Sequence, residues 1–310
     1  MSDNAFDVAR ECLLAAANAL ERTGSTPTMV LADGRAFPVA ELSRPGHWGR
    51  LLASLVHGRP RRLDLPLAEA RLRLGHGIRG AGGKGKENAL IVFRDGEVTR
   101  VLKVALFRGN LARDVRMNRT LAAGPGVAPA VLDHDPRFRW ALFEYRPAGG
   151  GDGRSGGQLF FEAVAPVCYP LWGIRSRPVT AYLRRYGVTL EGINDYLSGL
   201  GFPRVAAGAT LPFSLVHGGQ PERECYLDRQ GRPTVLDWEK LHVAPVAYDA
   251  MKLGTAGKRA AVDFLEAQRD PDHPAPALQI AVAAATRALA SRGKARKYEK
   301  LARSVAPLLD

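Results

Sequence analysis

Apolar residues recur with two different periods along the first part of the chain. In residues 4–20 they are spaced three and four apart, which predicts an amphipathic helix. Residues 28–39 hold two short apolar runs joined by an Asp-Gly pair at 33–34, a pair that favours the turn of a β-hairpin. Pro38 lacks a backbone N–H, so the second strand is expected at a sheet edge. A second short helix is predicted for residues 49–57.

The rest of the chain changes from strand-like to helix-like patterns. A glycine-dense stretch at residues 75–86 lies among the strand-like runs, and Asp95-Gly96 predicts another hairpin turn. Because runs of strands precede runs of helices instead of alternating with them, we expect an α+β fold. The predicted strands are residues 71–74, 88–95, 97–106 and 140–147, and the predicted helices are residues 111–122, 179–186, 190–200, 277–289 and 295–309.

Length and composition indicate a globular protein. The chain has 310 residues, of which 46% are hydrophobic and 24% charged, so it can bury a substantial core. No run of about 18 apolar residues occurs and the N-terminus lacks the pattern of a signal peptide, so we expect no membrane span and a cytoplasmic location. Cys12, Cys168 and Cys225 are too far apart for a zinc motif or a disulfide framework, and we interpret them as ordinary buried or half-buried thiols.

The chain is strongly basic. Its formal net charge is +13, and Lys and Arg concentrate at residues 59–62, 71–86 and 292–297. Such clusters can attract a phosphate-rich or acidic partner, such as another protein, although a solvated basic surface has the same appearance. A nucleic-acid partner is less favoured, because aromatic residues do not interleave with the clusters as single-strand binding requires.

One stretch carries a recognisable chemical motif. Leu215-Val216-His217-Gly218-Gly219 is followed by two short apolar runs, residues 224–227 and 234–236, joined by a polar turn with glycine. They predict a hairpin, and Asp237-Trp238-Glu239 leaves its second strand. Acidic residues of this kind suit phosphoryl transfer, in which carboxylates hold metal ions and orient the attacking hydroxyl.

This stretch resembles the active-site loop of the aminoglycoside and choline phosphotransferase family. That family has the protein-kinase-like fold, and its loop reads His-Gly-Asp, four residues, Asn, a hairpin and then Asp-Trp-Glu. The resemblance implies a two-lobed α+β fold, with an antiparallel-sheet N-lobe at residues 67–147 and a mainly helical C-lobe at residues 148–310. Residues 1–66 would form an N-terminal accessory segment. Gly219 replaces the catalytic aspartate of the pattern, and Glu224 replaces its asparagine.

The resemblance also implies roles for residues outside the loop. Lys103, paired with Asp114, would contact the phosphates of ATP, and backbone groups of Glu144, Tyr145 and Arg146 would bind its adenine. The alternative for Lys103 is a solubilising residue on an edge strand.

Four residues of the C-lobe receive roles in the same way. Asp237 and Glu224 would hold Mg²⁺, although Asp237 could instead cap a turn. His217 would orient the loop, the alternative being a proton shuttle. Asp249 would brace the loop through its backbone, serve as the N-cap of a helix at residues 250–253, or do both.

Two function classes follow from the missing aspartate, and a third from charge. The first is a pseudokinase, a nucleotide-binding kinase fold that acts through a partner, since Gly219 cannot serve as a base. The second is an active ATP-dependent phosphotransferase acting on a small-molecule, sugar or protein hydroxyl, with Glu222 or Glu224 as a substitute base. A nucleic-acid-binding module is supported by charge alone.

Overall fold

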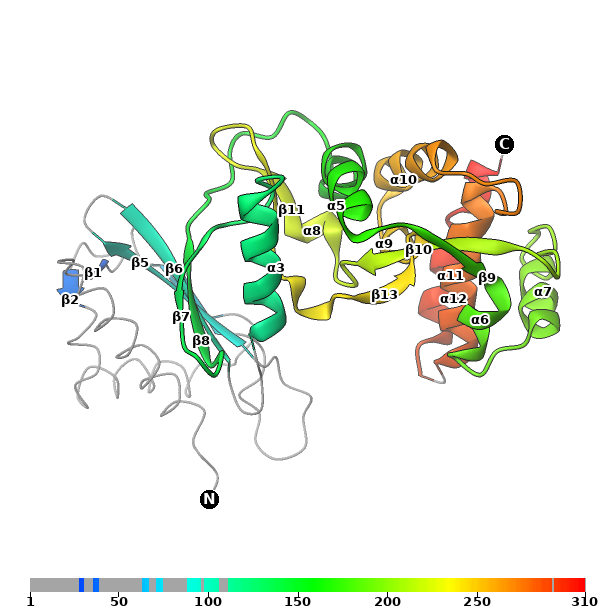
Figure 1. The fold of residues 1–310 in the computed structure, drawn as a ribbon, viewed down its shortest axis with the longest axis horizontal. Helices are drawn as coiled ribbons and strands as arrows, with labels where there is room; N and C mark the ends of the chain where they lie inside the picture. The colour runs from blue at the N-terminus through cyan, green and yellow to red at the C-terminus, as the bar shows by residue number, and fades with distance from the viewer. Residues whose placement is uncertain are drawn as a thin grey trace, which may run out of the picture. The chain divides into compact units, whose positions relative to one another are not determined.

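The fold is that of a computed structural model, which describes residues 28–30, 36–38, 63–66, 71–74, 88–95, 98–105, 111–291 and 293–309 (Figure 1). The chain divides into two compact units. Unit 1 comprises residues 1–123 and 129–146, and unit 2 comprises residues 124–128 and 147–310. The helices predicted for residues 4–20 and 49–57 and the glycine-dense stretch lie outside the described residues.

Unit 1 is built on one antiparallel sheet. Its strands lie in the order β2-β1-β5-β6-β8-β7, with β4 also paired to β5 and β3 paired to β4. β5 and β6 pair from Asn88↔Ala105 to Asp95↔Val98, the tight hairpin that the Asp-Gly pair predicted. The strand that contains Pro38 lies at an edge of this order, as expected. The strands are β1 Thr28–Val30, β2 Ala36–Pro38, β3 Leu63–Pro66, β4 Arg71–Leu74, β5 Asn88–Asp95, β6 Val98–Ala105, β7 Val131–His134 and β8 Trp140–Glu144.

One helix, α3 (Ala112–Ala123), packs on this sheet (Figure 1). Leu111 and Val115 contact Ala141 and Phe143 of β8 in a fully buried cluster. Burying an aliphatic side chain of this kind stabilises a fold by about 1.5–3 kcal/mol. The apolar face of α3 therefore fixes the helix against the central strands, and with it every residue that α3 carries.

Unit 2 is mainly helical. The run 210–216, which the sequence left unassigned, is a strand at the centre of a three-stranded antiparallel sheet in the order β13-β10-β9, and a separate hairpin pairs β11 with β12. The helix predicted to reach residue 309 ends at Arg303 and is followed by a short 3₁₀ turn. The strands are β9 Arg175–Pro178, β10 Thr210–Val216, β11 Cys225–Leu227, β12 Pro233–Val235 and β13 His242–Pro245. The helices are α4 Gly156–Leu159, η2 Phe160–Val164, α5 Ala165–Trp172, α6 Val179–Arg184, α7 Leu190–Ser198, α8 Pro221–Glu224, η3 Trp238–Lys240, α9 Ala247–Ala250, α10 Thr255–Ala267, α11 Pro276–Ala290, α12 Ala295–Arg303 and η4 Ala306–Leu308.

The core of unit 2 encloses two of the three cysteines. Cys168 and Cys225 are buried and free, and burial raises the pKa of each thiol to about 12. A thiol with so high a pKa stays protonated near neutral pH and is a poor nucleophile. The interpretation as buried thiols is confirmed for these two, and Cys12 lies outside the described residues.

The order of elements confirms the predicted fold class. A unit with an antiparallel sheet and one long helix is followed by a mainly helical unit, and every described strand pair is antiparallel. The fold is therefore α+β with the two-lobed, kinase-like succession. No helix within the described part of the chain has both the length and the apolar character to cross a membrane.

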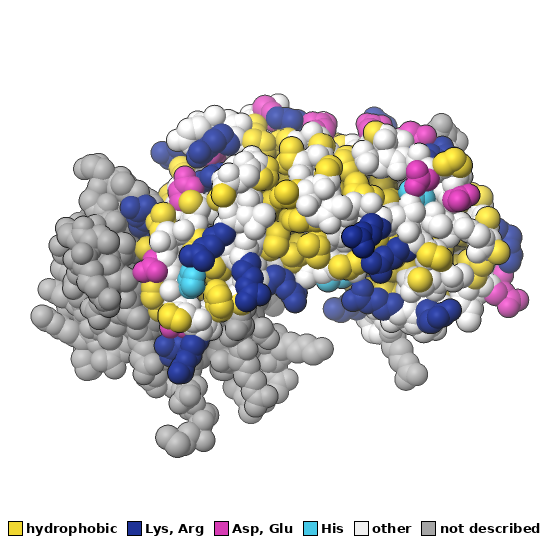
Figure 2. Space-filling view, viewed as in Figure 1, with side chains coloured by type: hydrophobic (Ala, Val, Ile, Leu, Met, Phe, Trp, Pro, Cys, Tyr) yellow, Lys and Arg dark blue, Asp and Glu magenta, His cyan; other side chains and the backbone are white. Residues whose placement is uncertain are grey.

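The described surface is rich in cations. On the face shown in Figure 2, Lys and Arg side chains gather over the part of unit 2 that contains β9 and α6, with few acidic side chains between them. Arg175 and Arg177 of β9 are exposed, and so are Arg184 and Arg185 at the end of α6. The basic surface of unit 2 therefore includes β9 and the end of α6, which lie outside the three Lys- and Arg-rich stretches of the sequence.

Candidate functional site

Unit 1 contains a buried ion pair. Lys103 lies on β6, between β5 and β8, and is only 7% exposed, so the alternative of a solubilising edge lysine is wrong. Its Nζ donates to Asp114 Oδ2 at 2.9 Å. Asp114 projects from the first turn of α3, and its Oδ1 accepts a hydrogen bond from Asn118 Nδ2 at 3.0 Å. Since a buried charge needs a charged partner and further hydrogen bonds, this arrangement fixes the position of the lysine ammonium.

The three residues named for adenine binding lie at the end of β8. The Glu144 N–H donates to Ala130 O at 2.9 Å, and the Glu144 carboxylate accepts from Ala130 N and Arg146 Nε. Arg146 is buried, whereas Tyr145 is 37% exposed. The Glu144 N–H is therefore engaged in the fold, and an adenine would have to meet backbone groups further along the segment.

In unit 2 the motif loop is held by a buried carboxylate. Asp249 Oδ2 accepts from His217 N at 2.7 Å, and Asp249 Oδ1 accepts from Gly218 N at 2.8 Å. Tyr169 Oη donates to the same carboxylate at 2.8 Å. Asp249 is not a helix N-cap, which was the other role expected for it, because it lies inside α9 (Ala247–Ala250). Its carboxylate braces the loop.

His217 links the loop to the segment after the hairpin. The ring is fully buried, its Nδ1 accepts from Gly219 N at 3.1 Å, and its Nε2 lies 2.8 Å from Leu236 O. An Nδ1 acceptor means that Nε2 carries the proton and donates to that carbonyl. The ring packs edge-on against Trp238 at 4.7 Å. Both ring nitrogens therefore hold backbone groups, which leaves neither of them for moving a proton.

Gly219 has no room for a side chain in this loop. A Cβ built on it would lie 2.6 Å from His217 Cε1 and 2.7 Å from His217 Nδ1, and would also collide with Glu224 Oε2. Glu224 folds back onto the loop, where its Oε2 accepts from Gln220 N at 2.6 Å. The carboxylate of residue 224 thus lies where a side chain at residue 219 would begin. Glu224 was expected to open a strand, but it is the last residue of helix α8.

Glu222 points away from this position. Its Oε2 accepts from Gly254 N at 3.3 Å and lies against Gly157. Its negative charge also acts on Lys258: burial lowers the pKa of this lysine, and Glu222 partly offsets the effect. Of the two candidate substitute bases, only Glu224 has its carboxylate at Gly219.

Asp237 follows the hairpin in an unusual conformation. Its φ of +68° and ψ of +51° are left-handed, a region that Asp and Asn adopt more readily than other non-glycine residues. Its side chain does not cap the 3₁₀ turn that follows, so the alternative of a capping residue finds no support. Among the described residues, no three His, Cys, Asp or Glu side chains come together as a metal cluster. Asp237 thus offers a hard-oxygen donor directly after Leu236, whose carbonyl His217 contacts.

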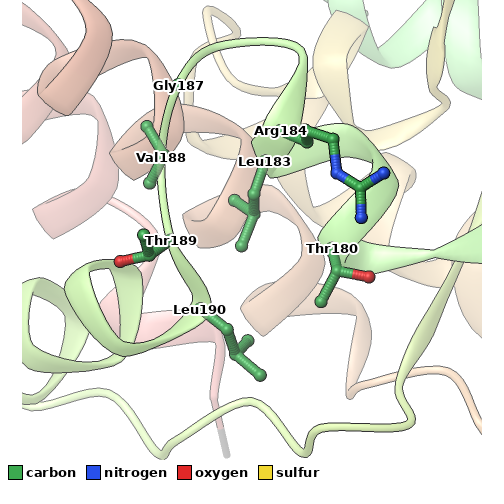
Figure 3. A pocket seen from close by; sticks show the side chains of 7 residues that line it. All are labelled: Thr180, Leu183, Arg184, Gly187, Val188, Thr189 and Leu190. Atoms are coloured by element: carbon green, nitrogen blue, oxygen red, sulfur yellow. The ribbon is translucent and has the colours of Figure 1, made fainter.

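A pocket of unit 2 lies apart from the motif residues. It has a volume of about 370 Å³ and lies between α6 and the start of α7 (Figure 3). Arg184 is the only ionisable residue among those that line it, and we assign it no function. The lining residues are Thr180, Leu183, Arg184, Gly187, Val188, Thr189 and Leu190.

Comparison with known proteins gives structural likeness only. No family model matches the sequence, and no curated protein does. Solved phosphotransferases resemble it. A macrolide 2'-phosphotransferase, MphH from Brachybacterium faecium, is 17% identical, covers 83% of this chain and 98% of its own, and has a TM-score of 0.45. A choline/ethanolamine kinase family protein from Mesorhizobium loti is 18% identical, and the match covers 84% of this chain and 98% of that protein, with a TM-score of 0.43.

A third likeness is to the choline kinase LicA from Streptococcus pneumoniae. It is 14% identical, and the match covers 74% of this chain and 93% of LicA, with a TM-score of 0.44. A second structure of LicA is a complex with AMP, and a structure of the aminoglycoside phosphotransferase APH(4)-Ia is a ternary complex with AMP-PNP and hygromycin B. AMP is thus a ligand of LicA, and AMP-PNP and hygromycin B are ligands of APH(4)-Ia.

Two residues of the site were missed by the sequence reasoning. Tyr169 donates to Asp249, and Lys252 Nζ donates to Gly219 O at 3.1 Å. Neither residue lies in a motif, and only the fold brings them to the loop. For Lys252 a signal did exist, because it follows the motif aspartate Asp249 by three residues in an otherwise apolar run.

Proposed function

We propose that this chain is a kinase-like, nucleotide-binding protein that transfers phosphate slowly or not at all and acts through a partner. The observation that carries the proposal is Gly219. It occupies the position of the catalytic aspartate in the resembling motif, and the His217 ring and the Glu224 carboxylate already fill the space beside it. A loop built in this way holds its backbone well but presents no aspartate to a substrate hydroxyl.

The nucleotide-binding part of the proposal rests on residues that keep the chemistry required. In unit 1, Lys103 is a buried cation oriented by Asp114, and it would contact the phosphates of ATP. In unit 2, Asp237 offers a carboxylate. Mg²⁺ prefers carboxylate ligands in combination with the oxygens of bound phosphates. Glu224 is less suited to the second ligand position, because its Oε2 is bonded to the Gln220 N–H. The bound ion would neutralise charge on the phosphates.

A second candidate function is an active phosphotransferase, and one observation favours it. The Glu224 carboxylate lies beside Gly219, so a carboxylate is present in the loop although it comes from a different position. It would accept the proton of an acceptor hydroxyl as the missing aspartate does. Turnover of ATP by the unmodified protein at about 1 s⁻¹ or faster, an ordinary enzymatic rate, would favour this candidate over the first.

Nucleotide binding is expected to depend on Mg²⁺ through Asp237. We expect Mg²⁺ to tighten ATP binding by about tenfold, or 1.4 kcal/mol. Asp237→Asn should reduce this gain to within about twofold, because the amide lacks the charge that holds the ion yet tolerates the left-handed backbone. The measurement is titration calorimetry with ATP, in the presence of Mg²⁺ and in the presence of a chelator.

Asp263→Asn is the matched control, since it removes the same charge from an exposed position on α10. It should leave the Mg²⁺ effect unchanged. Equal ATP affinities with and without Mg²⁺, in the unmodified protein and in Asp237→Asn alike, would argue against a metal site at Asp237. Absence of ATP binding under every condition would remove the nucleotide-binding proposal itself.

A further inference from the structure

One edge of the sheet in unit 2 is open to solvent. The strand β9 (Arg175–Pro178) lies at the end of the order β13-β10-β9, so within this sheet it pairs with β10 alone. All four of its residues are exposed. An exposed edge strand presents main-chain N–H and C=O groups to which another extended segment can bind as an additional strand.

The pairing with β10 shows which main-chain groups of β9 point outward. Val179 N donates to Ala209 O at 2.9 Å, and in an antiparallel pair the main-chain groups of every second residue point to the same neighbour. Ser176, which lies opposite Pro212, therefore points away from β10. Pro212 agrees with this, because it has no N–H and its carbonyl accepts from Val246 N at 2.8 Å. Within the described residues, the N–H and C=O of Ser176 have no hydrogen-bond partner.

The two arginines of β9 project from one face of the sheet. Arg175 pairs with Phe213 and Arg177 pairs with Leu211, and residues two apart on a strand point to the same side. The guanidinium carbon of Arg177 lies 5.6 Å from the centroid of the Phe213 ring, which places it on that face. In the described part of the chain neither arginine forms an ion pair, and β9 belongs to the region where cations gather in Figure 2.

The opposite face of β9 has a negative charge. Ser176 Oγ donates to Asp270 Oδ2 at 2.8 Å and lies 3.0 Å from His273 Nε2. His273 Nδ1 accepts from Asp270 N at 3.1 Å, so Nε2 carries the ring proton and donates to the serine hydroxyl. Asp270 is exposed. An acidic side chain bound at this edge would therefore be attracted on the arginine face and repelled on the Ser176 face.

We infer that β9 binds an acidic, extended segment of a partner protein, which joins the three-stranded sheet as a further strand. The main chain of that segment would bond to the outward N–H and C=O of Ser176. Its acidic side chains would stand at alternate positions and pair with Arg175 and Arg177, whose spacing of about 7 Å is that of alternate residues in any extended chain. The residues between them would be neutral, because they face Asp270.

A nucleic acid fits this edge less well than a protein segment. It has no main chain in which N–H and C=O groups alternate, so it would leave the outward groups of Ser176 unused. Single-strand binding also needs aromatic rings on which bases can stack. The ring on the arginine face, Phe213, is buried, and Arg177 lies over it.

The inference deepens the proposed function and rests on the part in which the protein acts through a partner. It names the chemistry of that partner, and all the residues that carry it belong to unit 2. Peptide binding is measured without ATP, so its absence would leave the results on ATP binding and turnover standing. Fast turnover of ATP would refute slow transfer and would leave the binding of a peptide at β9 unaffected.

The experiment is calorimetric titration of the full chain, at constant ionic strength, with the peptide Thr-Glu-Thr-Glu-Thr blocked at both ends. We expect this alternating peptide to bind. Thr-Thr-Glu-Glu-Thr has the same composition but places its glutamates on opposite faces of a strand, so it should bind about fivefold more weakly. Arg175→Glu should weaken binding of the alternating peptide by about tenfold or more, since it replaces an attraction by a repulsion. Arg259→Glu, the identical change at an exposed position of α10, should alter binding by less than about twofold.

Two substitutions of Ser176 test the main-chain bonds. Ser176→Pro removes the outward N–H without removing a hydrogen bond of the sheet, because proline is tolerated where the N–H of an edge strand faces solvent. It should weaken binding of the alternating peptide by about fivefold. Ser176→Ala is the matched control: it removes the hydroxyl but keeps the N–H, and should leave binding within about twofold.

Any of five results would overturn the inference. The first is absence of binding at about 5 mM of the alternating peptide, which would make the arginines mere protection of an exposed edge. Equal affinities for the two peptides, or equal weakening by Arg175→Glu and Arg259→Glu, would show an effect of net charge alone. Equal binding by Ser176→Pro and Ser176→Ala would exclude strand addition. Tighter binding of a thymidine trinucleotide, which has the same two negative charges, would indicate a nucleic-acid surface. If Arg175→Glu fails to fold, Arg175→Gln replaces it, with an expected loss of about threefold.

Discussion

Asp249→Ala is expected to lower the free energy of unfolding of this protein by about 3–5 kcal/mol. Asp249 is 3% exposed, and its carboxylate accepts from His217 N, Gly218 N and Tyr169 Oη. Alanine would leave three buried donors without an acceptor, and each such donor costs about 1–3 kcal/mol. The change amounts to a large part of the stability of a typical domain. Urea unfolding followed by circular dichroism measures it.

Two variants show whether the loss comes from the loop network. Tyr169→Phe removes one of the three donors together with its need for an acceptor, so it should cost only about 1 kcal/mol. Asp195→Ala removes a carboxylate from an exposed ion pair on α7 and should change stability by less than about 0.5 kcal/mol. If Asp249→Ala costs no more than Asp195→Ala, the carboxylate does not hold the loop in solution.

The double variant Gly219→Asp with Glu224→Asn is expected to raise ATP turnover by about 10²–10⁴-fold, the usual contribution of a general base. It restores both residues of the resembling motif at once. The pairing of the two changes matters, because a Cβ at residue 219 collides with Glu224 Oε2 and the smaller Asn side chain removes that collision, so that the loop has only to shift away from the His217 ring. ADP release in steady state, with water as the acceptor, measures the rate.

The single variants separate the two candidate functions. Gly219→Asp alone should gain less than the double variant, since the new side chain meets Glu224 as well as the His217 ring, which is packed against Trp238. Glu224→Gln in the otherwise unmodified protein should leave a slow rate unchanged if the loop lacks a base. A fall in that rate by two orders of magnitude would identify Glu224 as the base and would refute the first candidate.

The parts of the site that the sequence predicted came from the motif resemblance or from local pattern. The pairing of Lys103 with Asp114 was implied by the resemblance, and the structure has the two side chains 2.9 Å apart. The hairpin that precedes Asp237 is predicted by a polar turn with glycine between two short apolar runs. Neighbouring residues along the chain determine the geometry of this hairpin, so the sequence is sufficient to predict it.

The parts that the sequence did not predict depend on side-chain direction and distant packing. Nothing in the spacing of Glu222 and Glu224 says which carboxylate turns towards Gly219, because that choice follows from Gly254 and Gly157 packing beside Glu222. The strand β10 was unassigned because a short apolar run fits a buried strand and a buried helix equally well. Lys252 reaches the loop because Asp249 of the preceding helix α9 is hydrogen-bonded to the loop backbone.

The bond from Tyr169 to Asp249 bears on how the protein is made. It joins residues that are 80 positions apart in the sequence, and the bond from His217 N to Asp249 joins residues that are 32 positions apart. Chains emerge from the ribosome N-terminus first, so the histidine and both glycines of the motif appear before the carboxylate that holds them. A nascent chain that stops short of Asp249 carries the motif without its acceptor. The loop therefore takes shape late, once α9 has been synthesised and has docked.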